Sequence, residues 1–303
     1  MKTIIPPFLK RGAHITIVCP SGYLPEEKAV QAGKVLEEWG YSVTLGATTR
    51  TANSYFSGTD EERLADLQQA LDDPHTDAVL MGRGGNGLSR IIDRLDFTAF
   101  EKNPKWILGF SDITVLQAHL FRQYHIATMH APMCSAFAEE NLDLQYMAVF
   151  RGLLSGEALR YDFAGHEQNI AGEAEGILIG GNLCMMAHLA GSDSLPDTDG
   201  KVLFIEDVGE HLYKVDRMLY TLKRSGRLAK IKGLVCGNFS DMEDTTRPFG
   251  EDLYSIIKAH VADLGVPVAF EVPCGHETIN YPLVLGAACR LKVTKKGTII
   301  QQL

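Results

Sequence analysis

A serine stands where an apolar, strand-like run gives way to a helix-like segment. The run Trp106–Phe110 is followed directly by Ser111, and the helix-like segment extends from Asp112 to Gln123. A sharp turn at such a junction exposes the hydroxyl group, and N–H groups at the helix start can stabilise a developing oxyanion. Ser111 is therefore a candidate nucleophile. The alternative is an ordinary N-cap serine.

A glycine-rich turn follows another strand-like run, Asp77–Met81. Its centre carries Arg83, Gly84, Gly85 and Asn86. Glycines let the backbone approach a ligand closely and direct N–H groups at an anion. The turn has neither the ending of a P-loop nor the spacing of a dinucleotide fingerprint. Its arginine can bind a carboxylate in a bidentate manner or act as a structural ion-pair partner.

Two further strand-to-loop junctions carry groups that can assist a serine. Glu206 and Asp207 close one apolar run, and a carboxylate there can orient a histidine. His276 follows another run on a loop that contains glycine, where an imidazole can serve as a general base near neutral pH. Loop residues are ordinarily polar and solvated, which is the alternative for both groups. His130 and His211 are further candidates for the base.

The three candidates occur in the order serine, glutamate, histidine. This is also the order of the catalytic residues in α/β-hydrolases. However, Ile113 occupies the position two residues after Ser111, where the elbow of that fold requires glycine. The chain also lacks the long series of strands on both sides of the serine. The chain therefore shares the order of these residues with α/β-hydrolases but departs from the rest of that pattern.

Strand and helix signals alternate regularly in the first half of the chain. Strands are expected at His14–Pro20, Tyr41–Leu45, Asp77–Met81 and Trp106–Phe110, and helices at Glu26–Gly40, Asp60–Leu71, Gly87–Leu95, Asp112–Gln123 and Asn141–Leu154. Such alternation predicts a parallel sheet covered by helices. The carboxyl ends of the strands in such a sheet form the usual ligand-binding edge.

In the second half, short strand signals and helix signals are mixed without regular alternation, and the chain is expected to form two domains. Residues 155–175 are polar, show no clear periodicity, and are predicted to connect domains at 1–154 and 176–303. Beyond them, short strands are expected at Gly176–Ile179, Lys201–Ile205, Ile231–Cys236, Pro267–Val272, Arg290–Val293 and Thr298–Gln301, with helices at Asn182–Ala190, Lys214–Ser225 and Gly250–Leu264. The last two strands are typical of a hairpin. The predicted fold class is α/β.

Composition excludes several classes of function. The 303 residues carry a net charge of −9, which argues against nucleic acid as the main partner. No apolar stretch approaches the roughly 18 residues of a membrane span, and the N-terminus does not resemble a signal peptide. The six cysteines form no CxxC pair, which favours reduced thiols in the cytoplasm. Neither cysteines nor histidines have the spacing of a metal site, and no cofactor is expected.

Taken together, the ordered motifs are similar to those of the LD-carboxypeptidase family, cytoplasmic serine peptidases that trim murein peptides. The resemblance runs nearly from end to end. Its motifs are Pro20–Gly22, Phe56–Arg63, Arg83–Gly85, Gly109–Asp112, Gly180–Leu183, Phe204–Asp207, Asp216–Leu219, Gly275–His276 and Pro282–Leu283. So many motifs in family order are far more specific than any one of them.

The resemblance implies a Ser–Glu–His triad that removes the terminal D-alanine from an L,D-bond in muropeptides. The nucleophile would lie in an N-terminal Rossmann-like domain, and the other two residues in a β-rich C-terminal α/β domain. The oxyanion would be met by the backbone N–H groups of Asp112 and Gly85, and the expected substrate-binding residues are Arg83, Gly84 and Asn86. The family resemblance further implies a homodimer and a murein peptide as the partner, with no membrane association.

One departure and two alternatives qualify this interpretation. Asn86 stands where the family usually has tyrosine, so the wall beside the oxyanion turn differs. Within the same family, microcin C self-immunity peptidases cleave a peptidyl-nucleotide and stack its base on an aromatic side chain of the C-terminal domain. Both tryptophans here, Trp39 and Trp106, lie outside that domain. The second alternative is a non-catalytic, two-domain binding protein of periplasmic type, which would leave the triad order unexplained.

Overall fold

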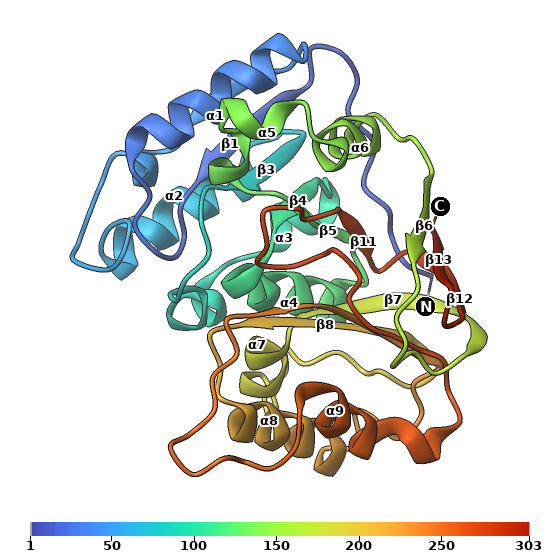
Figure 1. The fold of residues 1–303 in the computed structure, drawn as a ribbon. Helices are drawn as coiled ribbons and strands as arrows, with labels where there is room; N and C mark the ends of the chain where they lie inside the picture. Colours follow the sequence, from blue (N-terminus) through green and yellow to red (C-terminus); the bar gives the residue numbers. More distant parts are fainter. Residues whose placement is uncertain (1, 303) are drawn as a thin grey trace.

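The fold consists of two β-sheets, one formed mainly by each half of the chain, with helices around and between them (Figure 1). The computed structural model describes residues 2–302. The first sheet has the strand order β11–β5–β4–β3–β1–β2, and the second has the order β10–β9–β8–β7–β12–β13–β6. The expected α/β class is confirmed.

The first sheet is parallel except at one edge. Its strands are β1 His14–Val18, β2 Ser42–Leu45, β3 Ala78–Met81, β4 Trp106–Gly109, β5 Thr128–His130 and β11 Leu283–Leu285. Strands β1 to β5 pair in parallel, and β11 pairs antiparallel with β5. The parallel sheet expected from the alternating signals is therefore present. It gains a final strand from far along the chain.

The second sheet combines a parallel and an antiparallel part. Its strands are β6 Leu159–Ala164, β7 Gly172–Asn182, β8 Val202–Val208, β9 Gly233–Ser240, β10 Val268–Ala269, β12 Ala288–Val293 and β13 Gly297–Gln302. Strands β7 to β10 are parallel, whereas β12, β13 and β6 are antiparallel to their neighbours. The expected C-terminal hairpin is confirmed as the pair β12 and β13.

Local sequence explains where one helix of the first half begins. The helices of this half are α1 Glu26–Glu38, α2 Asp60–Asp72, α3 Thr98–Lys102, α4 Thr114–Tyr124, α5 Glu139–Leu142 and α6 Gln145–Leu154. Helix α2 begins with a capping box, in which the side chains of Thr59 and Glu62 each accept a backbone N–H of the other residue. The helix expected over Gly87–Leu95 is instead two single 3₁₀ turns, Leu88–Arg90 and Ile92–Arg94.

Three helices of the second half cover the face of the second sheet that is turned away from the first. They are α7 Leu183–His188, α8 Leu212–Arg224 and α9 Leu253–Val261. Helix α4 lies on the other face and packs against both β7 and α7 (Figure 1). The helix that begins beside Ser111 is therefore in contact with both halves of the molecule.

Three strands were not expected from the sequence. Strands β5 and β11 have only three residues each, too few for alternation of apolar and polar residues to be visible. Strand β6 falls within residues 155–175, the segment expected to be a connection. That expectation is wrong for Leu159–Ala164, where apolar and polar residues alternate with the period of a strand. The division into domains at residues 154 and 176 stays a prediction.

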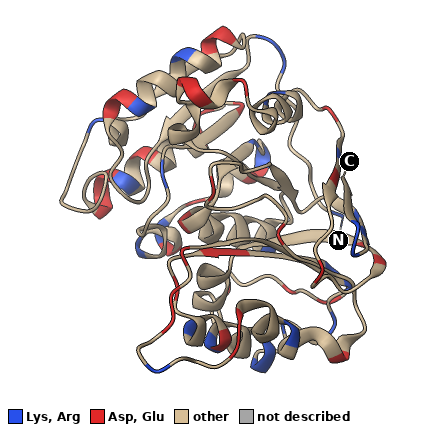
Figure 2. Ribbon diagram, in the orientation of Figure 1, with Lys and Arg blue, Asp and Glu red and all other residues tan. Residues whose placement is uncertain are grey.

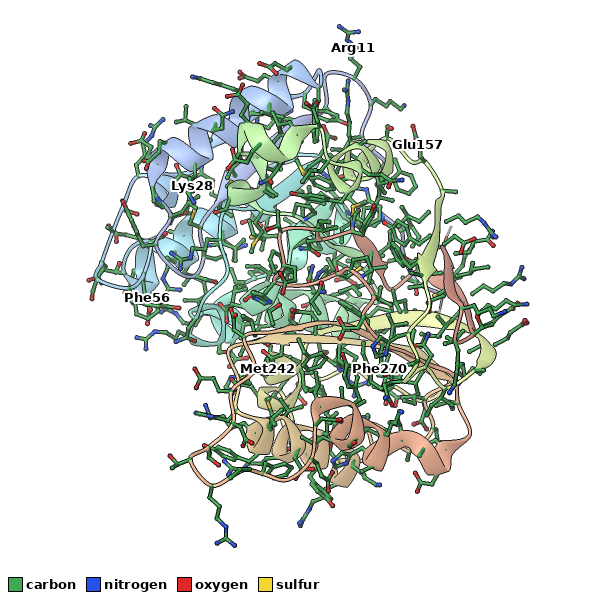
Figure 3. The ribbon with its side chains drawn as sticks, in the orientation of Figure 1. Arg11, Lys28, Phe56, Glu157, Met242 and Phe270 are labelled. Carbon is green, nitrogen blue, oxygen red and sulfur yellow. The ribbon has the colours of Figure 1, made fainter. Side chains whose placement is uncertain are left out.

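The two halves share their apolar core. Trp106 and Phe204 belong to one buried cluster, and Ile107 and Ile205 belong to a second. Side chains fill the space between the layers (Figure 3). Each large apolar side chain removed from water contributes about 1.5–3 kcal/mol. A core of this kind holds the sheets at a fixed separation, which matters for any site assembled from both.

Charged residues concentrate away from this core. Lys and Arg are interspersed with Asp and Glu along the outer helices and loops (Figure 2). Among residues 2–302, no helix is both long and apolar enough to cross a membrane.

Candidate active site

Ser111 lies in a strained turn at the carboxyl end of β4. It begins a 3₁₀ turn, Ser111–Ile113, that leads directly into α4. Its φ of +67° is in the left-handed region, which residues other than glycine seldom adopt. Strain of this kind persists only where the surrounding structure enforces it, and it is typical of nucleophile elbows. The sharp turn expected from the sequence is present.

The glycine turn passes directly beside this serine. A Cβ atom added to Gly84 would lie 2.7 Å from the Ser111 Cβ and 2.9 Å from its Oγ. The same point lies 3.4 Å from the backbone nitrogen of Asp112. Only glycine fits here. The turn is held by a 3.0 Å hydrogen bond from the Gly22 N–H to the Gly84 carbonyl.

Gly85 offers a free donor in this turn. Across residues 2–302, its backbone N–H donates to no backbone or side-chain acceptor. The residue adopts a φ of +109°, and an added Cβ would come within 2.8 Å of the Tyr55 hydroxyl. The structure thus brings the turn that carries one expected oxyanion donor, Gly85, next to Asp112, which carries the other.

The carboxylate of Asp112 braces the loops around the serine, a role that the sequence analysis did not assign. Its Oδ2 accepts a 2.6 Å hydrogen bond from the Ser21 hydroxyl and a 2.9 Å bond from the Leu88 N–H. Burial raises the pKa of this carboxyl, and the two hydrogen bonds counter that effect in part. One side chain therefore ties together the loops that follow β1, β3 and β4.

Glu206 and His276 form a buried hydrogen-bonded pair. Glu206 lies within β8, where the register with β9 shifts, rather than after the strand as expected. Its Oε2 lies 2.7 Å from the His276 Nδ1. The Glu206 side chain is 0% exposed and the His276 side chain 17% exposed. Because Nδ1 faces the carboxylate, it carries the proton in the neutral ring, and Nε2 is left to accept one.

The environment of His276 raises its pKa. Burial of the ring acts to lower it, but the hydrogen bond and charge of Glu206, with the charge of Asp207, more than offset burial. The Asp207 carboxylate makes its own hydrogen bonds to other residues. It accepts hydrogen bonds from the Asn182 amide and the Cys184 N–H, both at 2.9 Å, and burial raises its pKa to about 6.

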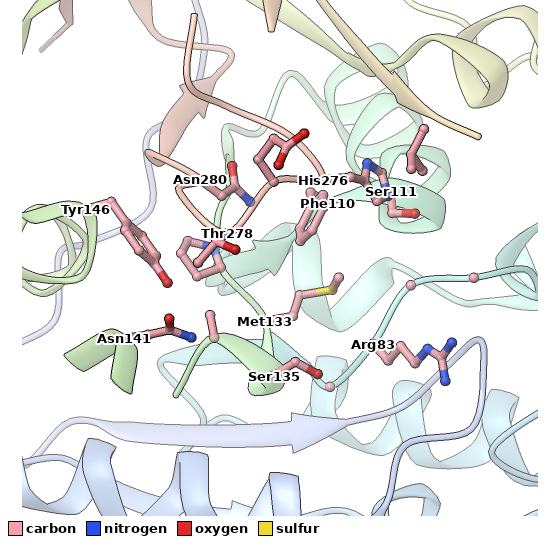
Figure 4. Close-up of a pocket in the computed structure, with 17 residues that line it drawn as sticks. Arg83, Phe110, Ser111, Met133, Ser135, Asn141, Tyr146, His276, Thr278 and Asn280 are labelled. Atoms are coloured by element: carbon pink, nitrogen blue, oxygen red, sulfur yellow. The ribbon is translucent and has the colours of Figure 1, made fainter. Parts of the chain in front are cut away.

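Ser111 and His276 open into the same cavity of about 600 Å³ (Figure 4). The Phe110 ring lies edge-on to the His276 imidazole, with centroids 4.9 Å apart. Within residues 2–302, no hydrogen bond joins Ser111 to His276. Such bonds are often long in enzymes without substrate and shorten when the substrate binds.

The cavity wall comes from both halves of the chain. From the first half, it includes the glycine turn, the end of β4, the loop after β5 and the start of helices α5 and α6. The loop that carries His276 closes the other side. The lining residues are Gly82, Arg83, Gly84, Gly85, Phe110, Ser111, Pro132, Met133, Ser135, Ala136, Asn141, Tyr146, Val208, His276, Glu277, Thr278 and Asn280.

The expected substrate-binding residues fall in different places. Arg83 and Gly84 line the cavity, whereas Asn86 is exposed and does not. The Arg83 guanidinium donates a 2.7 Å hydrogen bond to the Tyr23 carbonyl. The sequence analysis gave a structural ion pair as the alternative role of Arg83. In the structure, its partner is a backbone carbonyl and not a carboxylate.

Several lining residues were missed by the sequence analysis. Asn141, Tyr146 and Ser135 come from segments that carry no motif, and their side chains face the cavity in Figure 4. Polar residues at a helix start carry no sequence signal that separates binding from capping. The other candidate bases are not on the cavity wall. His130 is fully buried behind it, and His211 lies 3.5 Å from Glu243.

In the part of the chain that the structure describes, no group of three or more His, Cys, Asp or Glu side chains is placed to hold a metal ion.

Comparison with known proteins identifies the class. The LD-carboxypeptidase N-terminal domain matches residues 15–131, and the LD-carboxypeptidase C-terminal domain matches residues 175–291. The chain belongs to the LD-carboxypeptidase family.

Individual relatives agree with this assignment. The murein tetrapeptide carboxypeptidase of Pseudomonas aeruginosa is 30% identical over 88% of this chain and 89% of its own. The crystal structure of muramoyltetrapeptide carboxypeptidase from Oxalobacter formigenes has a TM-score of 0.87 at 31% identity and covers 95% of this chain and 98% of its own. The microcin C7 self-immunity protein of Escherichia coli is more distant, at 23% identity over 93% of this chain and 90% of its own.

The contact between Gly84 and Ser111 predicts the effect of adding one methyl group. Gly84→Ala should slow covalent labelling of Ser111 by a fluorophosphonate at least about tenfold, because the new Cβ must displace the serine or the turn. Gly33→Ala is the matched control, since its Cβ would make only an ordinary 3.6 Å contact with Val43. Labelling rates are measured by intact-protein mass spectrometry. Equal rates for both variants would contradict the close approach.

The raised pKa of His276 predicts how labelling depends on pH. The imidazole must be neutral to accept a proton, so the labelling rate should fall as the pH drops through a midpoint above the usual histidine value of about 6.5. Glu206→Gln removes the charge that raises this pKa, so the midpoint should move to lower pH and the plateau rate should fall. The test is the rate constant from pH 5 to 9. A flat profile would exclude His276 as the base.

Proposed function

We propose that this protein is a serine carboxypeptidase that removes the terminal D-alanine of murein tetrapeptides across an L,D-bond. The observation that carries the proposal is the buried Glu206–His276 hydrogen bond in a cavity shared with the strained Ser111. The names of the Pseudomonas and Oxalobacter relatives support the substrate.

The triad would act in two steps. The Ser111 Oγ attacks the scissile carbonyl while the His276 Nε2 takes its proton, and Glu206 stabilises the imidazolium. The N–H groups of Asp112 and Gly85 stabilise the oxyanion. D-Alanine leaves with the proton from His276, and an acyl-enzyme remains. Water then gives its proton to His276 and attacks the ester carbon. His276 returns this proton to the Ser111 Oγ as the ester bond breaks, which releases the shortened peptide and restores the serine.

Recognition of a terminal carboxylate distinguishes a carboxypeptidase from an endopeptidase. Among the lining residues, Arg83 is the single lysine or arginine. One of its N–H groups is engaged by the Tyr23 carbonyl, and the rest of the guanidinium fork is available for a carboxylate. The neighbouring turn supplies backbone donors. We therefore assign the terminal carboxylate to Arg83 and Gly84.

Neither alternative accounts for the site as well. The self-immunity peptidases need an aromatic side chain from the C-terminal half to stack on a nucleobase. Apart from His276 itself, the lining residues from that half are not aromatic: Val208, Glu277, Thr278 and Asn280. A non-catalytic binding protein would have no need of a strained serine beside a buried histidine–carboxylate pair.

Compartment, assembly and domain division belong to the same proposal. All six cysteines are free and five are buried, which supports a reducing compartment such as the cytoplasm. A homodimer rests on the family resemblance, and domains at 1–154 and 176–303 rest on the polar, aperiodic sequence of residues 155–175.

Loss of the nucleophile predicts loss of turnover. Ser111→Ala should lower kcat/KM for L-Ala-γ-D-Glu-diaminopimelate-D-Ala by about 10⁴-fold or more, because the attacking oxygen is gone. Ser225→Ala, at the end of α8, is the control and should match the parent. Release of D-alanine is followed by mass spectrometry. Retained turnover in a folded Ser111→Ala sample would refute the triad.

Recognition by Arg83 predicts discrimination against a blocked C-terminus. The parent protein should cleave the free tetrapeptide about 30- to 4,000-fold faster than its C-terminal amide, equivalent to about 2–5 kcal/mol for a charge-assisted pair. Arg83→Ala should shrink this ratio through slower cleavage of the free acid. Arg290→Ala, which removes an exposed ion pair with Glu175, should leave the ratio unchanged. Comparable rates on both peptides would indicate an endopeptidase or amidase instead.

A further inference from the structure

His130 is a buried histidine that the mechanism does not use. It lies at the end of β5, with its side chain fully buried between the rings of Phe110 and Phe204, whose centroids are 5.3 and 4.9 Å away. Burial lowers its pKa to about 4, although the charge of Glu206 and a hydrogen bond to Asn280 oppose this. The ring is therefore neutral at physiological pH.

Hydrogen bonds fix which nitrogen of His130 carries the proton. The Gly275 N–H donates to the Asn280 Oδ1 at 2.9 Å, so that oxygen is an acceptor. The His130 Nε2 lies 3.2 Å from the same oxygen and must therefore be the donor. Its Nδ1 is then unprotonated, and it has no partner among residues 2–302. The chain of contacts runs from His130 through Asn280 to Gly275, the residue before His276.

This chain connects the base to the strand that carries the nucleophile. His130 is the register partner of Gly109, two residues before Ser111. Within residues 2–302, the bond between His130 and Asn280 is the only hydrogen bond from residues 1–154 to the loop 275–280. The other bonds of this loop to the rest of the chain run to the second sheet, including 2.6 Å from the Ser240 hydroxyl to Glu277.

The position of the loop 275–280 is tightly constrained at Gly275. Gly275 has a φ of +139°, and a Cβ there would lie 2.9 Å from the Glu206 Oε2, the same oxygen that holds His276. A shift of Gly275 would therefore disturb the Glu206–His276 contact directly. The side chain of Asn280 stands on the cavity wall near His276 (Figure 4).

We propose that His130 is a positioning residue that, through Asn280 and Gly275, sets the distance between the His276 imidazole and Ser111. It holds the loop of one sheet to the neighbouring strand of the other. The inference rests on the proposed function, in which His276 is the base. The charged or titratable groups that face His130 are Glu206 and His276, and those that face His276 are Glu206 and Asp207.

The test compares two substitutions of His130, of which only one keeps an N–H donor for Asn280. His130→Gln keeps an N–H that can reach Asn280, whereas His130→Leu fills space without one. We expect His130→Leu to lower kcat for the tetrapeptide about 10- to 100-fold with KM within about twofold, the scale of a 1 Å misplacement. His130→Gln should recover most of kcat. His75→Gln, at an exposed site, is the control.

A second readout needs no substrate. In ¹⁵N-histidine NMR spectra, the His276 Nδ1–H signal should weaken in His130→Leu, and the His276 pKa should move down towards 6.5 as contact with Glu206 is lost. Asn280→Ala, which breaks the chain of contacts without altering the core, should do the same if His130→Leu fails to fold. Unchanged His276 titration in these variants would overturn the proposal, as would unchanged kcat with only a lower Tm.

The two readouts separate this proposal from the proposed function. If the parent protein fails to cleave tetrapeptide, the carboxypeptidase assignment falls, while the NMR titration still decides whether His130 positions His276. If cleavage depends on Ser111 but the titration and kcat ignore His130, only the positioning role falls.

Discussion

The proposed chemistry depends on the hydrogen bond between Glu206 and His276, which lies entirely in the second half of the chain. Ser111 stands at the end of a strand in the other sheet. Neither half therefore contains a complete site. The two sheets must keep one separation, which the shared apolar clusters, helix α4 and the pairing of β11 with β5 all enforce.

The sequence predicted the candidate residues where they coincide with the end of a regular element. Ser111, Glu206 and His276 each stand at or beside the end of an apolar run, and parallel strands bring such ends to one edge. The alternating signals of the first half predicted its sheet because apolar runs of four or five residues are distinct from the amphipathic pattern of the 13-residue helices α1 and α2. The capping box of α2 is equally local, since Thr59 and Glu62 are three residues apart.

What the sequence did not predict is mostly non-local. Strand β11 is three residues long, which is too short for a strand period to be visible. It forms because it pairs with β5, the edge strand of a sheet whose residues lie more than 150 positions earlier. The Arg83 guanidinium bonds a carbonyl 60 residues away. Tyr146 reaches the cavity from a helix whose apolar face predicts burial but not the neighbour it meets. Tertiary packing decides each of these.

Charge balance explains why His130, the second histidine beside the buried Glu206, is neutral. Glu206 is fully buried, and its Oε1 has no hydrogen-bond partner among residues 2–302. An uncompensated charge in such a place is costly. In the proposed mechanism, protonation of His276 relieves that cost because the pair becomes neutral overall. A charged His130 would compete for the same carboxylate and repel the imidazolium. Because burial keeps His130 neutral, the negative charge of Glu206 interacts with a positive charge only on His276, which shares the cavity with Ser111.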